Sequence, residues 1–512
     1  MHIFCGIVGA GVLVLPSTVA WLGWIGGPIS LILFWLISLF TSLLLADAYE
    51  VNGVENGQYH QAVYNIMGSR YAVAVGVCQV VNIFLINITY TITCATSMVA
   101  IATMACGSGG GCFNKLWEMS ALYGAFQLVL SQVPSLESAW WVSSLGAVTS
   151  ITYSSVALGL GAKYVGGGAA GSVGGIVASP VNKVFGVLSA LGGVAFAYSF
   201  AIILLEIQDT LKQPPKASKT MKPAASIGIT MSFVFYFCVA LVNYAAFGNG
   251  VQEFIFNSYP GPSWALYLGQ SCIILHIATA YQVFAQPVYN TLESHVKAFL
   301  VRRAVRRGDH SLEDRVVAAR RAAARVRGAT CSAEVANELA AEGGAQKAPP
   351  SKASLDSLPD PALARASPDK PTVLSRISSS VSTQVQVLGR PSSMYRVSTG
   401  LANEAMPLNE ERFLLPLWQR IIIRSTYVLI ATVIACIMPF FSDMAGLVGA
   451  LSFFPLSIFF PIRCWRRLYR PTGSFSWMLW ALEITMGIVS LLATIASVRG
   501  IINNASSYKL FG

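Results

Sequence analysis

Apolar segments of about 20 residues recur along most of the 512-residue chain, and this recurrence constrains the fold more than any other feature. A helix of that length crosses the hydrocarbon core of a bilayer, which is ~30 Å thick. Charged residues make up 11% of the sequence and hydrophobic residues 54%, whereas soluble domains are about a quarter charged. We therefore expect an all-α integral membrane protein.

The sequence contains about 11 transmembrane segments by this criterion. They span residues 1–22, 27–47, 71–104, 117–133, 139–161, 184–208, 224–247, 264–290, 420–440, 444–462 and 475–499. The first eight segments predict a transmembrane core at residues 1–292. The last three predict a second transmembrane region at residues 418–502. A short tail at residues 503–512 follows the last span.

Basic residues concentrate in three of the connections between these segments. Short loops rich in Lys and Arg stay on the cytosolic side of a membrane. The residues that set the orientation in this way are Lys212, Lys216, Lys219, Lys222, Lys297, Arg302, Arg303, Arg306, Arg307, Arg463, Arg466, Arg467 and Arg470. With an odd number of spans, this pattern predicts a cytosolic N-terminus and a C-terminal tail on the outside.

The connection at residues 293–417 is long and rich in Ala, Arg, Ser and Pro. Such a segment cannot bury enough apolar surface to offset the entropy of ordering it, so we expect a cytosolic loop that is largely disordered. Serines that follow Arg376 and Arg390 make a protein kinase a candidate partner for this loop. The net charge of +11 follows from the basic cytosolic loops, so membrane lipid is an expected partner and nucleic acid is not.

Two of the ten cysteines, Cys106 and Cys112, fall in one outside loop. Disulfides persist outside the cytosol, and we therefore expect these two to be bridged. No spacing of Cys and His resembles a metal site, so no metal and no cofactor is expected.

Two of the segments carry glycine pairs where a membrane helix is expected to continue. The first reads "IVGAGVLVL", with Gly9 and Gly11, and the sixth reads "ALGGVAFAYSF", with Gly192 and Gly193. Interrupted helices at matching places in two halves of a transporter mark its substrate site, as in LeuT. The first and sixth positions fit an inverted repeat of five plus five spans. The alternative is that these glycines serve close helix packing.

Breaks of this kind would leave backbone amides and carbonyls free, and their partial charges can bind charged groups of a ligand. Freed amides near Gly9, Ala10 and Gly11, at the positive end of a half-helix, can hold a carboxylate. Freed carbonyls in the sixth segment can accept an ammonium group, and the candidates are Ala195, Phe196, Ala197, Tyr198 and Ser199. Together they describe a site for a zwitterionic amino acid.

Longer stretches of the sequence carry a resemblance to a known family. The stretches "SFAIILLEIQDTLKQPPKASKTMKPA", "AYQVFAQPVY", "LSQVPSLESAWWVSS" and "GALSFFPLSIFFPI" closely resemble the amino acid permeases of plants and green algae, within the amino acid/auxin permease family. The resemblance runs from about residue 2 to residue 500, except for the central loop. It implies a LeuT-like fold and proton-driven import of amino acids across the plasma membrane by alternating access, and no enzyme activity.

Two histidines are candidates for the proton-coupling role, and both match positions where the family carries histidine. His276 lies in the eighth span, where an ionisable residue is costly and is by default a functional hypothesis. His2 lies about 10 Å from Gly9 toward the cytosol at 1.5 Å per residue. The alternative for each is a hydrogen bond that fixes packing.

Other polar residues in the spans are assigned less specific roles. Three residues of the third span are expected to line the cavity: Asn82, Tyr90 and Thr93. Glu206 and Asp209 are expected to belong to an inner gate, and Glu483 has no obvious partner.

Two further functions stay open. The first is that of a non-transporting amino acid sensor with the same fold. The second is an inactive carrier with a truncated first helix, because Met1 stands so close to Gly9. Uptake measurements distinguish these from a proton-coupled permease.

Overall fold

The computed structural model describes residues 6–51, 53–106, 115–133, 140–167, 171–211, 215–307 and 415–507. Two compact units are distinguished, Met1–Glu293 with Leu417–Gly512, and Ser294–Pro416. Most of the predicted cytosolic loop, residues 308–414, lies outside the described residues. The following paragraphs concern the first unit.

Helices dominate the described part of the chain, and one two-stranded hairpin accompanies them. The longer helices are α2 (Gly11–Ala46), α3 (Tyr59–Met67), α4 (Ser69–Cys106), α5 (Leu116–Leu130), α6 (Trp140–Tyr164), α7 (Pro180–Ala197), α9 (Ala217–Phe247), α10 (Ser263–Arg306), α15 (Leu417–Ile437), α16 (Phe441–Ser452), α17 (Phe460–Tyr469) and α18 (Ser474–Ser507). The short elements are β1 (Glu50–Val51), β2 (Val54–Glu55), η2 (Ala201–Ile203), α8 (Leu204–Gln208), η3 (Gly248–Gly250), η4 (Ile255–Ser258) and η5 (Phe453–Phe459).

Nine helical stretches within the described residues are long and apolar enough to cross a membrane. Their outward side chains are apolar, as in Val73 and Ile484, which are 66% and 59% exposed. Isolated exposed apolar residues are ordinary, but whole helix faces of them require a lipid environment. The predicted all-α integral membrane fold is confirmed.

Helix α2 contains the first two predicted spans, which are separated by a break at Gly23. This glycine has φ 74° and ψ −176°, a conformation that favours glycine. A side chain there would also meet the Val173 carbonyl oxygen at 2.2 Å. Helix α5 is 15 residues long, shorter than the other spans. The expected number of about 11 spans, and the inverted repeat, stay predictions.

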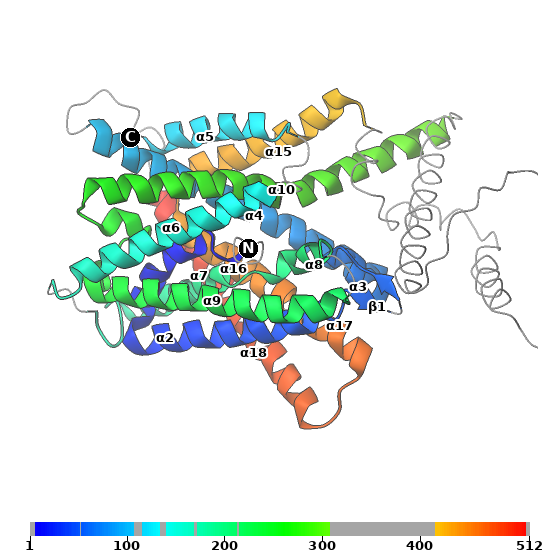
Figure 1. Ribbon diagram of the computed structural model, residues 1–512, viewed down its shortest axis with the longest axis horizontal. Coiled ribbons are helices and arrows are strands. Elements are labelled where there is room, and N and C mark those ends of the chain that lie inside the picture. The colour runs from blue at the N-terminus through cyan, green and yellow to red at the C-terminus, as the bar shows by residue number, and fades with distance from the viewer. Residues whose placement is uncertain are drawn as a thin grey trace, which may run out of the picture. The chain divides into compact units, whose positions relative to one another are not determined.

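Figure 1 shows two groups of helices at opposite edges of this unit. Helix α2 packs against α7 and α9, while α5 packs against α4 and α15. Helices α16 and α18 both pack on α7. The first turns of α2 and the C-terminal turns of α7 are buried within the bundle.

Two helices extend beyond the predicted boundaries. Helix α10 continues to Arg306, past the expected end of the core at residue 292, and α18 continues to Ser507, past residue 502. The added turns of α10 are rich in Ala, Leu, Lys and Arg, which favour helices. Residues 508–512 of the predicted tail lie outside the described residues.

Candidate substrate and proton site

The first span is interrupted at residues 8–10, between a short helical turn and the start of α2 at Gly11. The Gly9 amide donates to the Ile7 carbonyl oxygen at 3.0 Å. The amides of Gly11 and Val12, in the first turn of α2, have no hydrogen-bond partner among the described residues. Such orphan amides at a helix N-terminus attract anions.

Two tyrosines hold the carbonyl groups of this break. The Tyr236 hydroxyl of α9 donates to the Ile7 carbonyl oxygen at 2.5 Å. The Tyr153 hydroxyl of α6 donates to the Gly9 carbonyl oxygen at 3.0 Å. A buried carbonyl without a partner is costly, so these contacts stabilise the non-helical backbone. Neither tyrosine was identified from the sequence.

The sixth span is also interrupted, at residues 198–200, where α7 ends and η2 has not begun. The Ala195 carbonyl oxygen accepts from the Ser199 hydroxyl at 2.8 Å and from the Tyr198 amide at 3.2 Å. The Phe196 carbonyl accepts from the Ser199 amide at 3.3 Å.

Three further carbonyls of this break decide which groups remain available to a ligand. The Tyr198 carbonyl accepts from the Ser38 hydroxyl of α2 at 3.2 Å. The carbonyl oxygens of Ala197 and Ser199 accept no hydrogen bond from the described residues. Of the five predicted residues, these two therefore retain free acceptors for a cation.

The two breaks lie directly against each other. A methyl carbon added to Gly11 would lie 2.7 Å from the Cα atom of Ala197 and 2.9 Å from its Cβ atom. No side chain fits there without moving backbone. Gly11 is thus a close-packing residue, which is the alternative expected for this glycine. Its contact with Ala197 brings the first break against the second.

Gly9 faces a different environment. A methyl carbon added there would lie 3.5 Å from the Tyr90 hydroxyl and 3.7 Å from Nε2 of His276, which is ordinary contact. Tyr90 of α4, predicted to line the cavity, and His276 of α10 therefore both face the first break.

The ring of His276 is held in one orientation. Its Nδ1 lies 3.0 Å from the Gly146 carbonyl oxygen and 3.3 Å from the Ser150 hydroxyl, both on α6. Because a carbonyl only accepts, Nδ1 carries the hydrogen of the neutral ring. Nε2 is then the basic nitrogen; it is buried without a hydrogen-bond partner. The side chain is 1% exposed, so its basic atom is directed at the break.

The remaining predicted site residues have different outcomes. His2 and Cys112 lie outside the described residues. Cys106 is disulfide-bonded, and its pairing with Cys112 stays a prediction. Within the described ranges, no group of three or more His, Cys, Asp or Glu side chains is arranged to hold a metal ion.

Two acidic side chains lie in ion pairs or hydrogen bonds that bear on the predictions. The expectation that Glu483 has no partner is wrong, because Arg463 lies 2.9 Å from its Oε2. The loop between these two residues is short, and the pair joins α17 to α18. The Tyr49 hydroxyl donates to Asp209 Oδ1 at 2.9 Å. Burial, and then the Asp209 carboxylate, raise the pKa of Tyr49 above its ordinary value.

A further buried ion pair was missed in the sequence. Arg424 of α15, 1% exposed, donates from Nε to Glu293 Oε1 of α10 at 2.8 Å. Its Nη1 donates to the Ser131 carbonyl oxygen at 3.0 Å. The sequence signal was Arg424 itself, a charged residue that directly follows three isoleucines in a predicted span.

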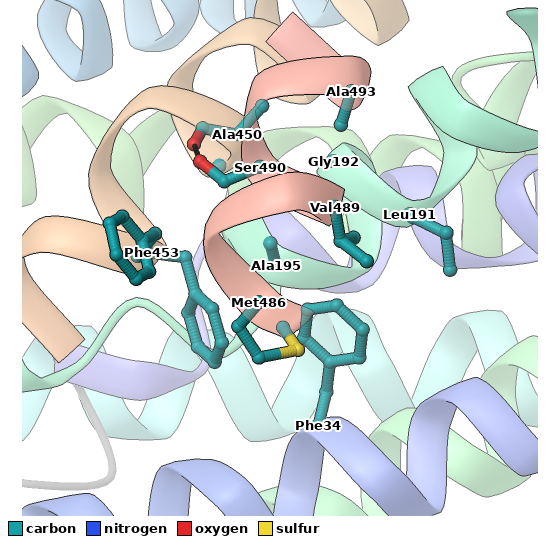
Figure 2. A pocket seen from close by; sticks show the side chains of 12 residues that line it. Phe34, Leu191, Gly192, Ala195, Ala450, Phe453, Met486, Val489, Ser490 and Ala493 are labelled. Atoms are coloured by element: carbon teal, nitrogen blue, oxygen red, sulfur yellow. Dashed lines mark hydrogen bonds between the residues drawn. The ribbon is translucent and has the colours of Figure 1, made fainter. Parts of the chain in front are cut away.

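A small pocket lies on the other side of α7 (Figure 2). Its walls are apolar, with Phe34, Ala195 and Met486 among them. The Ser490 hydroxyl donates to the Ala450 carbonyl and is not free for a ligand. A zwitterion has no charged or free polar partner in these walls, so this pocket is not the candidate substrate site.

An all-helical membrane bundle with two helix breaks in contact at its buried centre defines a membrane transporter. The model of the transmembrane amino acid transporter protein family matches residues 1–503, and the chain belongs to that family. It is similar to amino acid permeases 2, 3 and 6 of Arabidopsis thaliana, with 30%, 31% and 32% identity. These alignments cover 100% of this chain and 88%, 91% and 91% of the three relatives.

Proposed function

We propose that this protein imports amino acids together with protons across the plasma membrane by alternating access. The observation that carries the proposal is the contact between the two helix breaks, with Nε2 of His276 facing the first. Membership of an amino acid transporter family supports the substrate class.

The substrate carboxylate binds at the free amides of Gly11 and Val12. The N-terminal end of α2 carries a partial positive charge, which stabilises the anion. The substrate ammonium group binds near the free carbonyls of Ala197 and Ser199, at the partly negative C-terminal end of α7. The ligand that fits between these ends is an α-amino acid, since its two charged groups share one carbon atom.

His276 is the proposed acceptor of the coupled proton. Its Nδ1 hydrogen is committed to Gly146, so the proton enters at Nε2, which faces the substrate position at Gly9. A carboxylate bound beside the break stabilises the resulting imidazolium. Binding of the proton and of the amino acid is therefore mutually favourable, which is the requirement for symport.

The orientation follows from the basic loops, with the N-terminus in the cytosol and the C-terminus outside. The carboxyl end of the sixth span then lies on the cytosolic side, where Tyr49 and Asp209 are joined. Alternating access requires such contacts to form and break in each cycle.

The test is uptake of a labelled amino acid mixture into vesicles that contain the purified full-length chain, with and without an acid-outside pH gradient. We expect accumulation above equilibrium only with the gradient. Amino acids with an amidated carboxylate should compete poorly, because they lose the charge that the helix end attracts. Accumulation that does not depend on the pH gradient would contradict proton coupling. Binding of amino acids without transport would identify a sensor.

A further inference from the structure

Glu206 is a carboxylate in the sixth span that the mechanism above does not use. It lies in α8, just after the break in the sixth span. The residue as a whole is partly exposed, but its Oε2 atom is buried and has no hydrogen-bond partner. An ionised carboxylate with an unpaired buried oxygen carries a large desolvation cost.

Two other carboxylates in the described spans are paired with arginine, and Glu206 is not. Glu293 has Arg424 at 2.8 Å, and Glu483 has Arg463 at 2.9 Å. No Lys or Arg among the described residues lies within ion-pair distance of Glu206. Its negative charge therefore has no compensating cation.

The groups that do face Glu206 are neutral donors and other acids. Gln79 of α4 donates from Nε2 to Glu206 Oε1 at 3.0 Å and to the Ile202 carbonyl oxygen at 3.1 Å. The backbone amides of Tyr59 and of Glu206 itself also act on the carboxylate, as does the charge of Asp209. The Tyr59 hydroxyl donates instead to the Leu456 carbonyl oxygen.

A cation on a neighbouring helix is engaged by another carboxylate. Helices α2 and α9 pack against α8, and Lys222 of α9 is bound to Asp47 at 2.6 Å. Among the described residues, the charge that acts on Glu206 is that of Asp209, which has the same sign and favours a neutral carboxyl group.

We propose that Glu206 is a second proton-binding site, which holds a proton on Oε2 while the inner end of the transporter is closed. Gln79 holds Oε1 and fixes the orientation of the carboxyl group. The proton leaves Oε2 for cytosolic water when α8 separates from α4, because water then solvates the carboxylate. This proposal rests on the proposed proton coupling and adds a residue to it.

The first test compares Glu206→Gln with wild-type protein in reconstituted vesicles. Glutamine has the shape of the protonated acid but binds no proton. We expect exchange of labelled for unlabelled amino acid at equal pH to remain near the wild-type rate. Gradient-driven accumulation should fall to the level measured without a gradient. Glu118→Gln, in the first turn of α5, is the matched control and should accumulate like wild type.

The outcomes separate this inference from the proposed function. A wild-type protein that ignores the pH gradient contradicts proton coupling as a whole. A wild-type protein that responds, with a Glu206→Gln variant that accumulates equally well, overturns only the role of Glu206.

A second variant keeps the test decisive if Glu206→Gln does not reach the membrane. Gln79→Leu leaves the Glu206 carboxyl group in place and removes the amide that donates to it. That donor stabilises the ionised carboxylate. The proton should then be held more tightly, and the pH of half-maximal uptake should move to a higher value. An unchanged pH profile in Gln79→Leu would show that Glu206 serves packing and does not bind the coupled proton.

Discussion

Gly9 and Gly11 are two residues apart in the sequence, yet they differ in what a side chain would meet. At Gly11 an added carbon meets backbone at 2.7 Å, so any substitution there disturbs packing as well as binding. At Gly9 an added carbon meets the Tyr90 hydroxyl at 3.5 Å and His276 Nε2 at 3.7 Å. Only Gly9 allows the binding role to be tested apart from folding.

We predict that Gly9→Ala reduces uptake at least about tenfold, equivalent to ~1.4 kcal/mol of transition-state free energy. The methyl group occupies the space between the break and His276 that the substrate requires. The free energy of unfolding should change by no more than ~1 kcal/mol, as for other Gly→Ala changes in a compatible backbone. Uptake per surface molecule in transfected cells measures the effect.

The matched control is Gly159→Ala in α6, where an added carbon meets nothing within 4 Å. It should transport at the wild-type rate. Wild-type uptake by Gly9→Ala would show that the substrate binds away from this break.

For His276, we predict that His276→Asn abolishes the dependence of uptake on external pH and retains amino acid exchange. The asparagine amide can still donate to the Gly146 carbonyl, as Nδ1 does at 3.0 Å, but the basic Nε2 is lost. The measurement is the pH profile of initial uptake rates in vesicles.

His60→Asn in α3 is the control for this variant. Burial lowers the pKa of His60, so this histidine is neutral at pH 7 and its loss should leave the profile unaltered. If His276→Asn retains the wild-type pH profile, the histidine serves only packing.

The first break contains Gly9, as the sequence predicts, but the glycine pair of the sixth span does not mark its break. Gly192 and Gly193 lie inside α7, and the chain leaves the helix only at residues 198–200. The partners that stabilise the two breaks were not predictable from the sequence. Tyr153 reaches the Gly9 carbonyl across 144 positions of sequence, and Arg424 reaches Glu293 across 131. Such contacts depend on how helices pack, and hydrophobic periodicity within one helix carries no information about them.

At the scale of elements, the buried pair of Glu293 and Arg424 connects α10, α15 and the end of α5. We predict that Arg424→Leu lowers the free energy of unfolding by about 3 kcal/mol, because Glu293 is left as a buried charge. Arg420, 3.7 Å from Glu293 Oε2, keeps the loss toward the lower end of the usual range. Denaturant unfolding in detergent micelles measures it.

A double variant supplies the control for this pair. Adding Glu293→Leu to Arg424→Leu removes the unpaired charge, so part of the lost stability should return. Additive losses in the two single variants and the double variant would show that the two side chains do not interact.

At the scale of the whole molecule, the predicted disulfide between Cys106 and Cys112 tests the proposed orientation as well as the pairing. We predict that mass spectrometry without reductant recovers a peptide in which Cys106 is joined to Cys112, because an outside loop is oxidising. Cys436, which is a free thiol in the structure, is the internal control and should be alkylated. A free Cys106 on surface-expressed protein would contradict both the bridge and the outside placement of this loop.

In the proposed alternating-access cycle, the contact between Tyr49 and Asp209 limits how easily the transporter opens at the end proposed to face the cytosol. The Tyr49 phenol stays protonated, since burial and Asp209 raise its pKa, and it donates to Asp209 at 2.9 Å. A hydrogen bond to a charged acceptor contributes about 1.5–3 kcal/mol. Its removal in Tyr49→Phe should therefore increase the population of the open form about tenfold or more.

We predict that this increase appears as faster hydrogen–deuterium exchange in α8 and in the hairpin of β1 and β2, measured on the purified protein. Exchange reports local opening, and its rate rises in proportion to the open population. Peptides from α15, which has no contact with Tyr49 among those described, should exchange as in wild type. Lys216→Ala is a useful comparison, because its bond to Glu50 is exposed to solvent and such pairs contribute little. Equal exchange of α8 in Tyr49→Phe and wild type would mean that other contacts hold the inner end closed.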